Sequence, residues 1–309
     1  MEENVLIIGA TLLDIKGKPH AGLEPGTSNP ATISSVRGGT ARNVAENLAR
    51  LGANVQLITA VGDDPTGALL LEQTAVAGVA LEYACTIPDA NTGAYMVVLD
   101  TVGKMSVAMD DVSIMQHITP AYLYQYRRLF RNAHMIMIDG SLTPAAIKTV
   151  VNLATKYKVA LCADPSSARL AHKIRPYLSA LHLLVPNAIE EAELLEVDYA
   201  GFDPNLSLAQ ARRLVSLGVK NVAITLSDFG LDYATSDETG YIAPNFTEMV
   251  DSTGTGDAVT AAIIFGILNN LPTLECMRLG AAAASLTLQT TDTVVPDLSL
   301  DMLYDHLIV

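Results

Sequence analysis

The feature that most constrains this chain is a repeated alternation of short aliphatic runs with stretches of helical periodicity. The aliphatic runs of strand length are residues 5–9, 55–60, 135–138, 159–163, 181–185 and 221–226. The clearest helical stretches are 40–51, 65–76, 144–157, 188–195, 208–217, 257–268 and 273–288, and further helical stretches are 121–130, 169–178 and 300–307. Buried strands that alternate with helices predict a mostly parallel sheet covered by helices on both faces. We therefore expect an α/β fold.

Two segments interrupt this alternation. Residues 12–37 show no helical pattern and are punctuated by glycine and proline. Residues 82–112 contain strand patterns at 93–99 and 104–109, which a turn joins without an intervening helix. Such a pattern predicts an antiparallel ribbon. We expect the two segments to pair as a small β-sheet standing off one domain that spans residues 1–309.

The composition excludes several classes of protein. Half of the 309 residues are hydrophobic and 17% are charged, whereas disordered chains are poor in apolar residues and rich in charge. The formal net charge of −14 argues against nonspecific binding to nucleic acid. No apolar run approaches the ~18 residues of a spanning helix, and the acidic first residues do not predict a signal peptide. We expect neither nucleic acid nor a membrane as partner.

The three cysteines, Cys85, Cys162 and Cys276, lie far apart. An odd and scattered set argues against a disulfide framework or a zinc site. The six histidines are likewise isolated, without a partner at a spacing typical of metal ligands. These observations favour a reducing, cytoplasmic environment.

The most informative motif is DSTGTGD at residues 251–257, which an apolar helical pattern follows. Gly254 and Gly256 let the backbone turn tightly with its amide groups facing outward, and the helix adds the positive end of its dipole. Together they suit the charge on a transferring phosphoryl group. Asp257, in the first helical turn, is placed to accept the proton of an attacking hydroxyl. Taken alone, the pattern is more typical of an ordinary helix cap.

A second glycine pair, Gly38-Gly39, precedes another helix and permits close approach of the backbone to a ligand. Asn43, one turn into that helix, suits sugar hydroxyls. Asp14 follows the first strand, near the edge where open α/β sheets bind ligands, and its carboxylate can accept from two neighbouring hydroxyls. The alternatives are a tight strand-to-helix turn and a solvated loop acid.

A third pair, Asn187 and Glu190, is spaced to share one face of a helix. An amide and a carboxylate suit hydrated Mg²⁺, which keeps most of its waters. The alternative is a capped acidic helix start. The chain contains neither the Gly-x4-Gly-Lys-Ser/Thr phosphate loop nor a Gly-x-Gly-x-x-Gly after the first strand, so neither a P-loop enzyme nor a dinucleotide-binding site is supported.

The motifs occur in the order Asp14, Gly38-Gly39 with Asn43, Asn187 with Glu190, and Gly254-x-Gly256-Asp257. In this order and spacing they resemble the ribokinase-like (PfkB-type) carbohydrate kinase family over essentially the whole chain. The resemblance implies a three-layer α/β/α sandwich with a Rossmann-like sheet and a small β-sheet lid. It also implies ATP and Mg²⁺ as cofactors.

The resemblance further assigns roles to individual residues. Asp257 would be the catalytic base, and backbone amides around Gly254, Thr255 and Gly256 would form the anion hole. The sugar would contact Asp14, Gly38, Gly39 and Asn43. Mg²⁺ and its waters would be organised by Asn187 and Glu190. The nucleotide would lie against Asn187, Thr225, Ser227, Gly230, Gly254 and Gly256, with Ser227 standing where a glycine is common. Asp251 and Thr253 lie where some members bind K⁺.

Two short motifs of the predicted lid, SNP at 28–30 and NTGAY at 91–95, are similar to those of family members that phosphorylate pseudouridine. The similarity implies phosphorylation of the 5′-hydroxyl of that nucleoside. We expect Ser28, Asn29 and Thr92 to contact its base, because a site built to hydrogen-bond one group rejects analogues that lack it. The alternative role for these residues is turn formation.

Two other functions compete with this one. The first is a kinase of another ribonucleoside, of ribose or of a sugar phosphate, although the lid offers few basic residues for a phosphate. The second is a nucleoside-binding relative without activity, against which the intact Asp257 and glycines argue. Exposed edges and an apolar face of the lid sheet would favour a homodimer.

Overall fold

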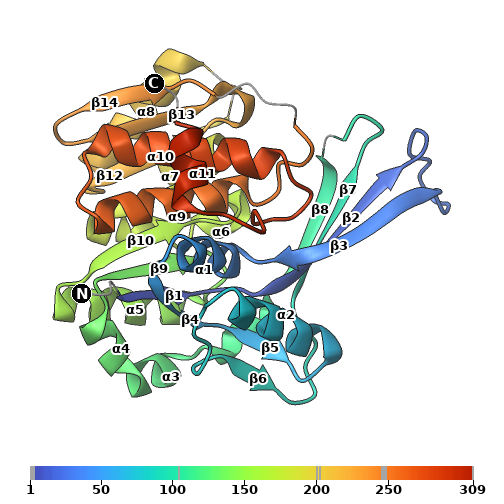
Figure 1. Cartoon of the computed structure of the whole chain (residues 1–309), viewed down its shortest axis with the longest axis horizontal. Coiled ribbons are helices and arrows are strands. Elements are labelled where there is room, and N and C mark those ends of the chain that lie inside the picture. The colour runs from blue at the N-terminus through green and yellow to red at the C-terminus, as the bar shows by residue number, and fades with distance from the viewer. Residues whose placement is uncertain (1–3, 104, 200, 202, 245–248, 308–309) are drawn as a thin grey trace.

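An eight-stranded sheet of order β14-β13-β12-β11-β10-β9-β1-β4 runs through the centre of the molecule (Figure 1). The computed structural model describes residues 4–103, 105–199, 201, 203–244 and 249–307. The strands are β1 (Asn4–Ile8), β4 (Asn54–Ile58), β9 (Met135–Asp139), β10 (Ala160–Asp164), β11 (Leu183–Leu184), β12 (Asn221–Thr225), β13 (Leu231–Thr235) and β14 (Thr239–Ile242). The six strands from β12 to β4 are parallel, as predicted, and β13 and β14 add an antiparallel edge.

Helices cover both faces of this sheet. They are α1 (Thr40–Arg50), α2 (Pro65–Val76), α3 (Pro120–Gln125), α4 (Arg127–Asn132), α5 (Pro144–Tyr157), α6 (Ala168–Ala171), α7 (Ala188–Leu195), α8 (Pro204–Ser216), α9 (Thr255–Leu268), α10 (Thr273–Leu288) and α11 (Leu300–Asp305). Three 3-10 turns, η1 (Ser113–His117), η2 (Arg175–Ala180) and η3 (Ser227–Phe229), complete the described elements.

Side chains on the two faces of the central sheet pack into two separate hydrophobic cores. In β1, Ile7 packs in a cluster with residues of α1, α9 and α10. Its neighbour Ile8 points the other way, into a cluster with residues of α5, α7 and α8. Because successive side chains of a strand alternate between faces, a strand with helices on both sides must be apolar throughout. This arrangement confirms the predicted three-layer α/β/α sandwich.

Two stretches predicted as single helices are divided. Residues 121–130 form α3 and α4, which meet at Tyr126, and residues 169–178 form α6 and the turn η2. Pro176 lies at the start of η2, where its missing N–H would interrupt a continuous helix. The sequence also gave no signal for the short strands β6 (Cys85–Ile87) and β14.

A second sheet of order β3-β2-β7-β8 projects from the sandwich, on the right in Figure 1. Its strands are β2 (Leu12–Pro19), β3 (Ala31–Gly38), β7 (Ala94–Leu99) and β8 (Met105–Asp111). The parallel pairing of β2 with β7 joins the two helix-free segments. We call this sheet the lid sheet.

The range 82–112 expected for the lid also holds β6, which pairs instead with β5 (Ala60–Gly62) in a separate two-stranded sheet. Lys104, with which the second ribbon strand was expected to begin, lies outside the described residues. Among the described helices, none is long and apolar enough to cross a membrane.

Candidate active site

Six of the predicted residues converge on one cavity of about 310 Å³ at the carboxyl edge of the parallel strands. They are Asp14, Gly39, Asn43, Asn187, Gly254 and Asp257. Asp14 comes from the lid sheet, whereas Gly39, Asn43 and Asp257 come from the starts of α1 and α9. The cavity therefore has walls from the sandwich and from the lid.

A second cavity, of about 250 Å³, lies on the other side of residues 252–256, at the start of α9. It is lined by the predicted residues Asn187, Thr225, Ser227, Gly230, Thr255 and Gly256, and by aliphatic side chains of α9 and α10. Asn187 and Ser252 line both cavities. The start of α9 thus stands between a polar cavity and a more apolar one.

The amino end of α9 forms the boundary between these cavities. Gly254 is its N-cap residue and has φ 83, a left-handed conformation in which a Cβ would overlap the carbonyl oxygen of Thr293. A side chain at Gly256, in contrast, would meet no atom within 4 Å. The first amides of a helix lack intrahelical acceptors, and Gly254, Thr255 and Gly256 line the two cavities at the positive end of the helix dipole. This geometry suits an anion.

Asp257 is held by a single side-chain contact recorded among the described residues. Asn43 donates from Nδ2 to Asp257 Oδ2 at 2.5 Å, which leaves Oδ1 available to a ligand. Burial and the nearby Asp164 carboxylate raise the pKa of Asp257 well above its ordinary value, while Asn43 and Arg42 oppose the shift. A carboxylate with a raised pKa is a stronger base.

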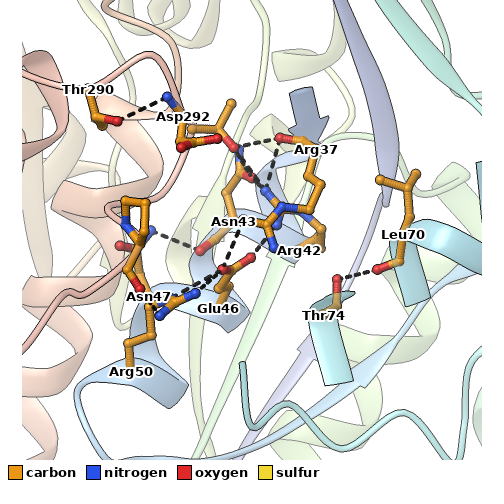
Figure 2. Close-up of polar contacts among 12 residues, drawn as sticks. Arg37, Arg42, Asn43, Glu46, Asn47, Arg50, Leu70, Thr74, Thr290 and Asp292 are labelled. Carbon is orange, nitrogen blue, oxygen red and sulfur yellow. Dashed lines mark hydrogen bonds and ion pairs between the residues drawn. The ribbon is translucent and has the colours of Figure 1, made fainter. Parts of the chain in front are cut away.

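The orientation of Asn43 is fixed from behind by a buried arginine (Figure 2). Arg42 is fully buried and donates to Asn43 Oδ1 and to Glu46 Oε2. Glu46 also pairs with Arg50 at 2.8 Å and Arg37 at 3.5 Å. Because the amide oxygen of Asn43 accepts from a cation, its NH₂ group must point toward Asp257. Burial lowers the pKa of Arg42 to about 10, which leaves it charged at neutral pH.

Asp14 lies directly over the Gly38-Gly39 pair. A Cβ on Gly38 would overlap the Asp14 carboxylate, and one on Gly39, where φ is 92, would overlap the carbonyl oxygen of Ala10. Glycine is required at both positions by this close approach. Burial raises the pKa of Asp14 to about 6, against the attraction of Arg42 and Lys16.

Two buried carboxylates, Asp164 and Glu190, and the half-buried Asp257 form an acidic cluster at the amino end of α9. The ion pairs recorded for the described residues include none to these three. Burial and the charges of Asp164 and Asp257 raise the pKa of Glu190 well above its ordinary value. Burial and the charge of Asp139 raise the pKa of Asp164 to about 6. A divalent cation would supply the missing positive charge, so the residues fit Mg²⁺.

Asn187 and Glu190 would reach such an ion through water, because both also serve as a helix cap. Asn187 Oδ1 accepts from the amides of Ile189 and Glu190, and Glu190 Oε2 accepts from the amide of Asn187 at 2.8 Å. This capping box realises the alternative role without excluding the proposed one. No cluster of three or more described His, Cys, Asp or Glu side chains is arranged to hold a metal directly.

Beside the second cavity, Ser227 keeps the backbone path that a glycine would take. It has φ 53, in the left-handed region that residues with a side chain seldom adopt. Gly230, at φ 89, closes the turn against the carbonyl oxygen of Ile242. Thr225, at the end of β12, also lines this cavity.

The structure does not bring Ser28, Asn29 and Thr92 to the cavity. Asn29 closes the tip of the β2–β3 hairpin by bonding the backbone of Glu24 and Thr27, and Ser28 is exposed beside it. The Thr92 hydroxyl donates to Asp64 at 2.8 Å. Asn29 therefore has the turn-forming role that the sequence left open, and neither Ser28 nor Thr92 lines the cavity.

Besides Leu12 and Asp14 of β2, the lid residues that line the cavity are Tyr95 and Asp110. Neither was predicted from the sequence, although both belong to the segment 82–112, because a strand pattern does not tell which face turns inward. Asp139, at the carboxyl end of β9, was not predicted either, and its Oδ2 accepts from the amides of Ala10 and Ala41. The signal that could have found it is an acid directly after the aliphatic run 135–138.

Asp251, expected near a monovalent cation, has both carboxylate oxygens engaged within the protein. Oδ2 lies 2.5 Å from Lys16 Nζ, and Oδ1 accepts from the amide of Thr253 at 2.9 Å. These contacts do not fit a free cation on this carboxylate.

Comparison with known proteins agrees with this geometry. The family model "pfkB family carbohydrate kinase" matches residues 2–299. The chain is 32% identical to a pseudouridine kinase of Escherichia coli (97% of this chain, 95% of the relative) and 26% identical to a guanosine-inosine kinase of Exiguobacterium acetylicum (95% and 97%). It superimposes on the Arabidopsis thaliana ribokinase complexed with ribose and ATP with a TM-score of 0.82 at 23% identity, over 100% of both chains.

Proposed function

Since this chain belongs to the pfkB family of carbohydrate kinases, we propose that it transfers the γ-phosphoryl group of ATP to the 5′-hydroxyl of pseudouridine. The products are pseudouridine 5′-phosphate and ADP. The observation that carries the proposal is the position of α9. Its amino end and Asp257 stand between a polar cavity suited to a sugar and a more apolar cavity suited to an adenine nucleotide.

In this mechanism Asp257 Oδ1 accepts the proton of the 5′-hydroxyl as its oxygen attacks the γ-phosphorus in line. Asn43 holds the other carboxylate oxygen, and Arg42 holds Asn43. Asp14 orients the sugar hydroxyls. The amides of Thr255 and Gly256 stabilise the charge that develops on the phosphoryl oxygens.

Mg²⁺ would be held through water by Asn187 and Glu190, and when bound it neutralises phosphate charge. The lid, from which Asp14 and Tyr95 reach the cavity, would exclude water as a competing acceptor.

The similarity to the E. coli pseudouridine kinase supports the choice of nucleoside, and one lid residue supports it chemically. Pseudouridine carries a ring N–H that uridine lacks, and Asp110 places a carboxylate acceptor in the lid wall of the cavity. The guanosine-inosine kinase favours a purine nucleoside as the second candidate, because it too matches nearly the whole chain.

An ADP-release assay over pseudouridine, uridine, inosine, guanosine, adenosine and ribose tests the proposal. We expect kcat/KM for pseudouridine to exceed that for uridine at least about tenfold. Asp110→Ala should remove most of this preference. Asp111→Ala is the matched control, because Asp111 bonds the amide of Ser113 and does not line the cavity. Equal turnover of uridine, or faster turnover of a purine nucleoside, would overturn the choice of substrate.

We further propose a homodimer through the outer face of the lid sheet. The register places Ile15 beside Met96 and Met96 beside Met109, with Val98 beside Val107 in the next row. Met96, Val107 and Met109 are exposed, as is Ile33 on β3. An apolar sheet face of this kind is suited to pairing with a second copy.

A further inference from the structure

One ion pair connects the lid sheet to the loop that precedes α9. Lys16, on β2, places Nζ 2.5 Å from Asp251 Oδ2, although the two residues are 235 positions apart in sequence. The side chain of Lys16 is only 8% exposed and that of Asp251 22%. A pair shielded from water to this degree is screened little by salt, and removal of one partner leaves an uncompensated charge.

Asp251 in turn shapes the loop that reaches the active site. Its Oδ1 accepts from the amide of Thr253, and the loop backbone bonds to the carbonyl oxygen of Leu288. The next residues, Ser252, Thr253 and Gly254, line the sugar-side cavity, and Gly254 caps α9. The position of Asp251 therefore sets the path of the backbone into the anion site.

Lys16 also faces a second carboxylate. Asp14 lies two residues earlier on the same strand, hence on the same face. The charge of Lys16 lowers the pKa of Asp14, whereas that of Asp251 raises it. The ammonium group thus lies near two acids: Asp14, which lines the first cavity, and Asp251, which holds the 251–254 loop. Neither Lys16 nor Asp251 lines either cavity, so Lys16 acts through its neighbours.

We propose that Lys16 is a positioning residue whose ammonium group is a built-in cation. It fixes the 251–254 loop and thereby places the amino end of α9. The ammonium group occupies the position beside Asp251 where a free monovalent cation would otherwise bind. The proposal rests on the phosphoryl transfer proposed above. Its consequence is an enzyme whose turnover does not require a free monovalent cation.

The test compares Lys16→Met with Lys18→Met, a matched change at an exposed position on the same face of β2. In Lys16→Met we expect kcat to fall about tenfold with the KM for ATP changed less than about threefold, since the residue touches neither substrate. Potassium chloride should restore part of this loss, and choline chloride at equal ionic strength should not. Wild type and Lys18→Met should respond alike to both salts.

A double-mutant cycle that combines Lys16→Met with Asp251→Asn tests whether the loss of kcat arises from the contact between these two residues. The double variant should lose no more activity than the worse single variant, because either change already breaks the contact. Additive losses, or an unchanged kcat in folded Lys16→Met, would overturn the proposal. A wild-type enzyme that requires potassium would do the same.

A second measurement separates this proposal from the proposed function. Amide hydrogen exchange in residues 250–255 should speed up in Lys16→Met and remain unchanged in Lys18→Met, without any substrate. If wild type phosphorylates none of the nucleosides or sugars, the proposed function fails while this result still stands. If exchange is unchanged, the positioning role fails while kinase activity stands.

Discussion

The sandwich and the lid sheet differ in how completely their strands are buried. In β9 all five residues are buried, whereas in β8 six of the seven are exposed and the other is half-buried. Both strands carry aliphatic side chains, so hydrophobicity alone does not separate them. The sandwich is packed on two sides, and it holds the groups that require exact placement. The lid is packed on one side, and it supplies the groups that we propose to contact the substrate.

The same difference appears in the polar contacts. Within the sandwich, Asp257 is held by Asn43, which Arg42 and Glu46 fix from a fully buried position. From the lid, Asp14 contributes one carboxylate over a glycine pair, and its neighbour Lys16 ties the strand to the sandwich. Changes in the sandwich should therefore affect the chemical step, and changes in the lid should affect binding and assembly.

The largest effect is expected at Asp257. Asp257→Asn removes the base but keeps the shape of the side chain, so kcat should fall about 10³-fold, within the usual range for general-base catalysis. Nucleoside affinity, measured by titration calorimetry, should change little. Activity equal to that of wild type would show that Asp257 is not the base, and the sandwich would then lose its assigned role.

An intermediate effect is expected at Asp14. Its raised pKa means that the carboxylate becomes neutral as the pH falls below about 6, so the KM for the nucleoside should rise there. Asp14→Asn should raise the KM about tenfold at neutral pH, as for loss of a charge-assisted hydrogen bond. It should also flatten the pH dependence of KM, with kcat recorded separately. A KM that rises equally at low pH in both proteins would contradict this assignment.

The outer face of the lid should govern assembly and not chemistry. Val107→Lys places a charge within the apolar face and should convert the dimer to a monomer in analytical ultracentrifugation. Val76→Lys is the control, because Val76 is 84% exposed on α2, outside the lid sheet. A dimer that survives Val107→Lys would place the interface elsewhere.

The smallest effect is expected at Glu191, a buried acid of the sandwich outside the site. Burial and the nearby Asp232 raise its pKa from 4.5 to about 8, and its Oε1 has no recorded partner in the described part of the chain. A raised pKa of an acid means that stability falls as the pH rises from 4.5 toward 8. Glu191→Gln should therefore raise the Tm by about 2–5 °C above pH 8 and leave it unchanged near pH 5. A difference in Tm between Glu191→Gln and wild type that does not change with pH would show that packing, and not the charge of Glu191, causes it.

Much of the sandwich could be predicted because its signals are local. The ranges of α2, α5, α7 and α10 agree with the predicted helices, since proline, threonine and asparagine mark their starts. The glycine pairs were equally clear. Gly39 and Gly254 adopt positive φ at places where a Cβ would overlap the backbone, a constraint that only glycine meets without strain.

The contacts between distant segments could not be predicted in this way. Arg42 follows the glycine pair and looks like a surface residue, yet it is fully buried because Glu46 and Asn43 surround it. Ser28, Asn29 and Thr92 have the composition of a binding loop, but none of them lines the cavity, whereas Tyr95 and Asp110 do. Which lid residues line the cavity depends on which face of the lid sheet turns inward.

The sequence by itself determined the class of fold, the order of the motifs and the identity of the proposed base, because each follows from spacing along one element. Only the tertiary structure decided that Lys16 meets Asp251, that Asn43 meets Asp257, and that Asp164, Glu190 and Asp257 gather at the amino end of α9. The physical reason is that these contacts join segments far apart in the chain. Their energies depend on burial, which appears only when the sheets and helices have packed.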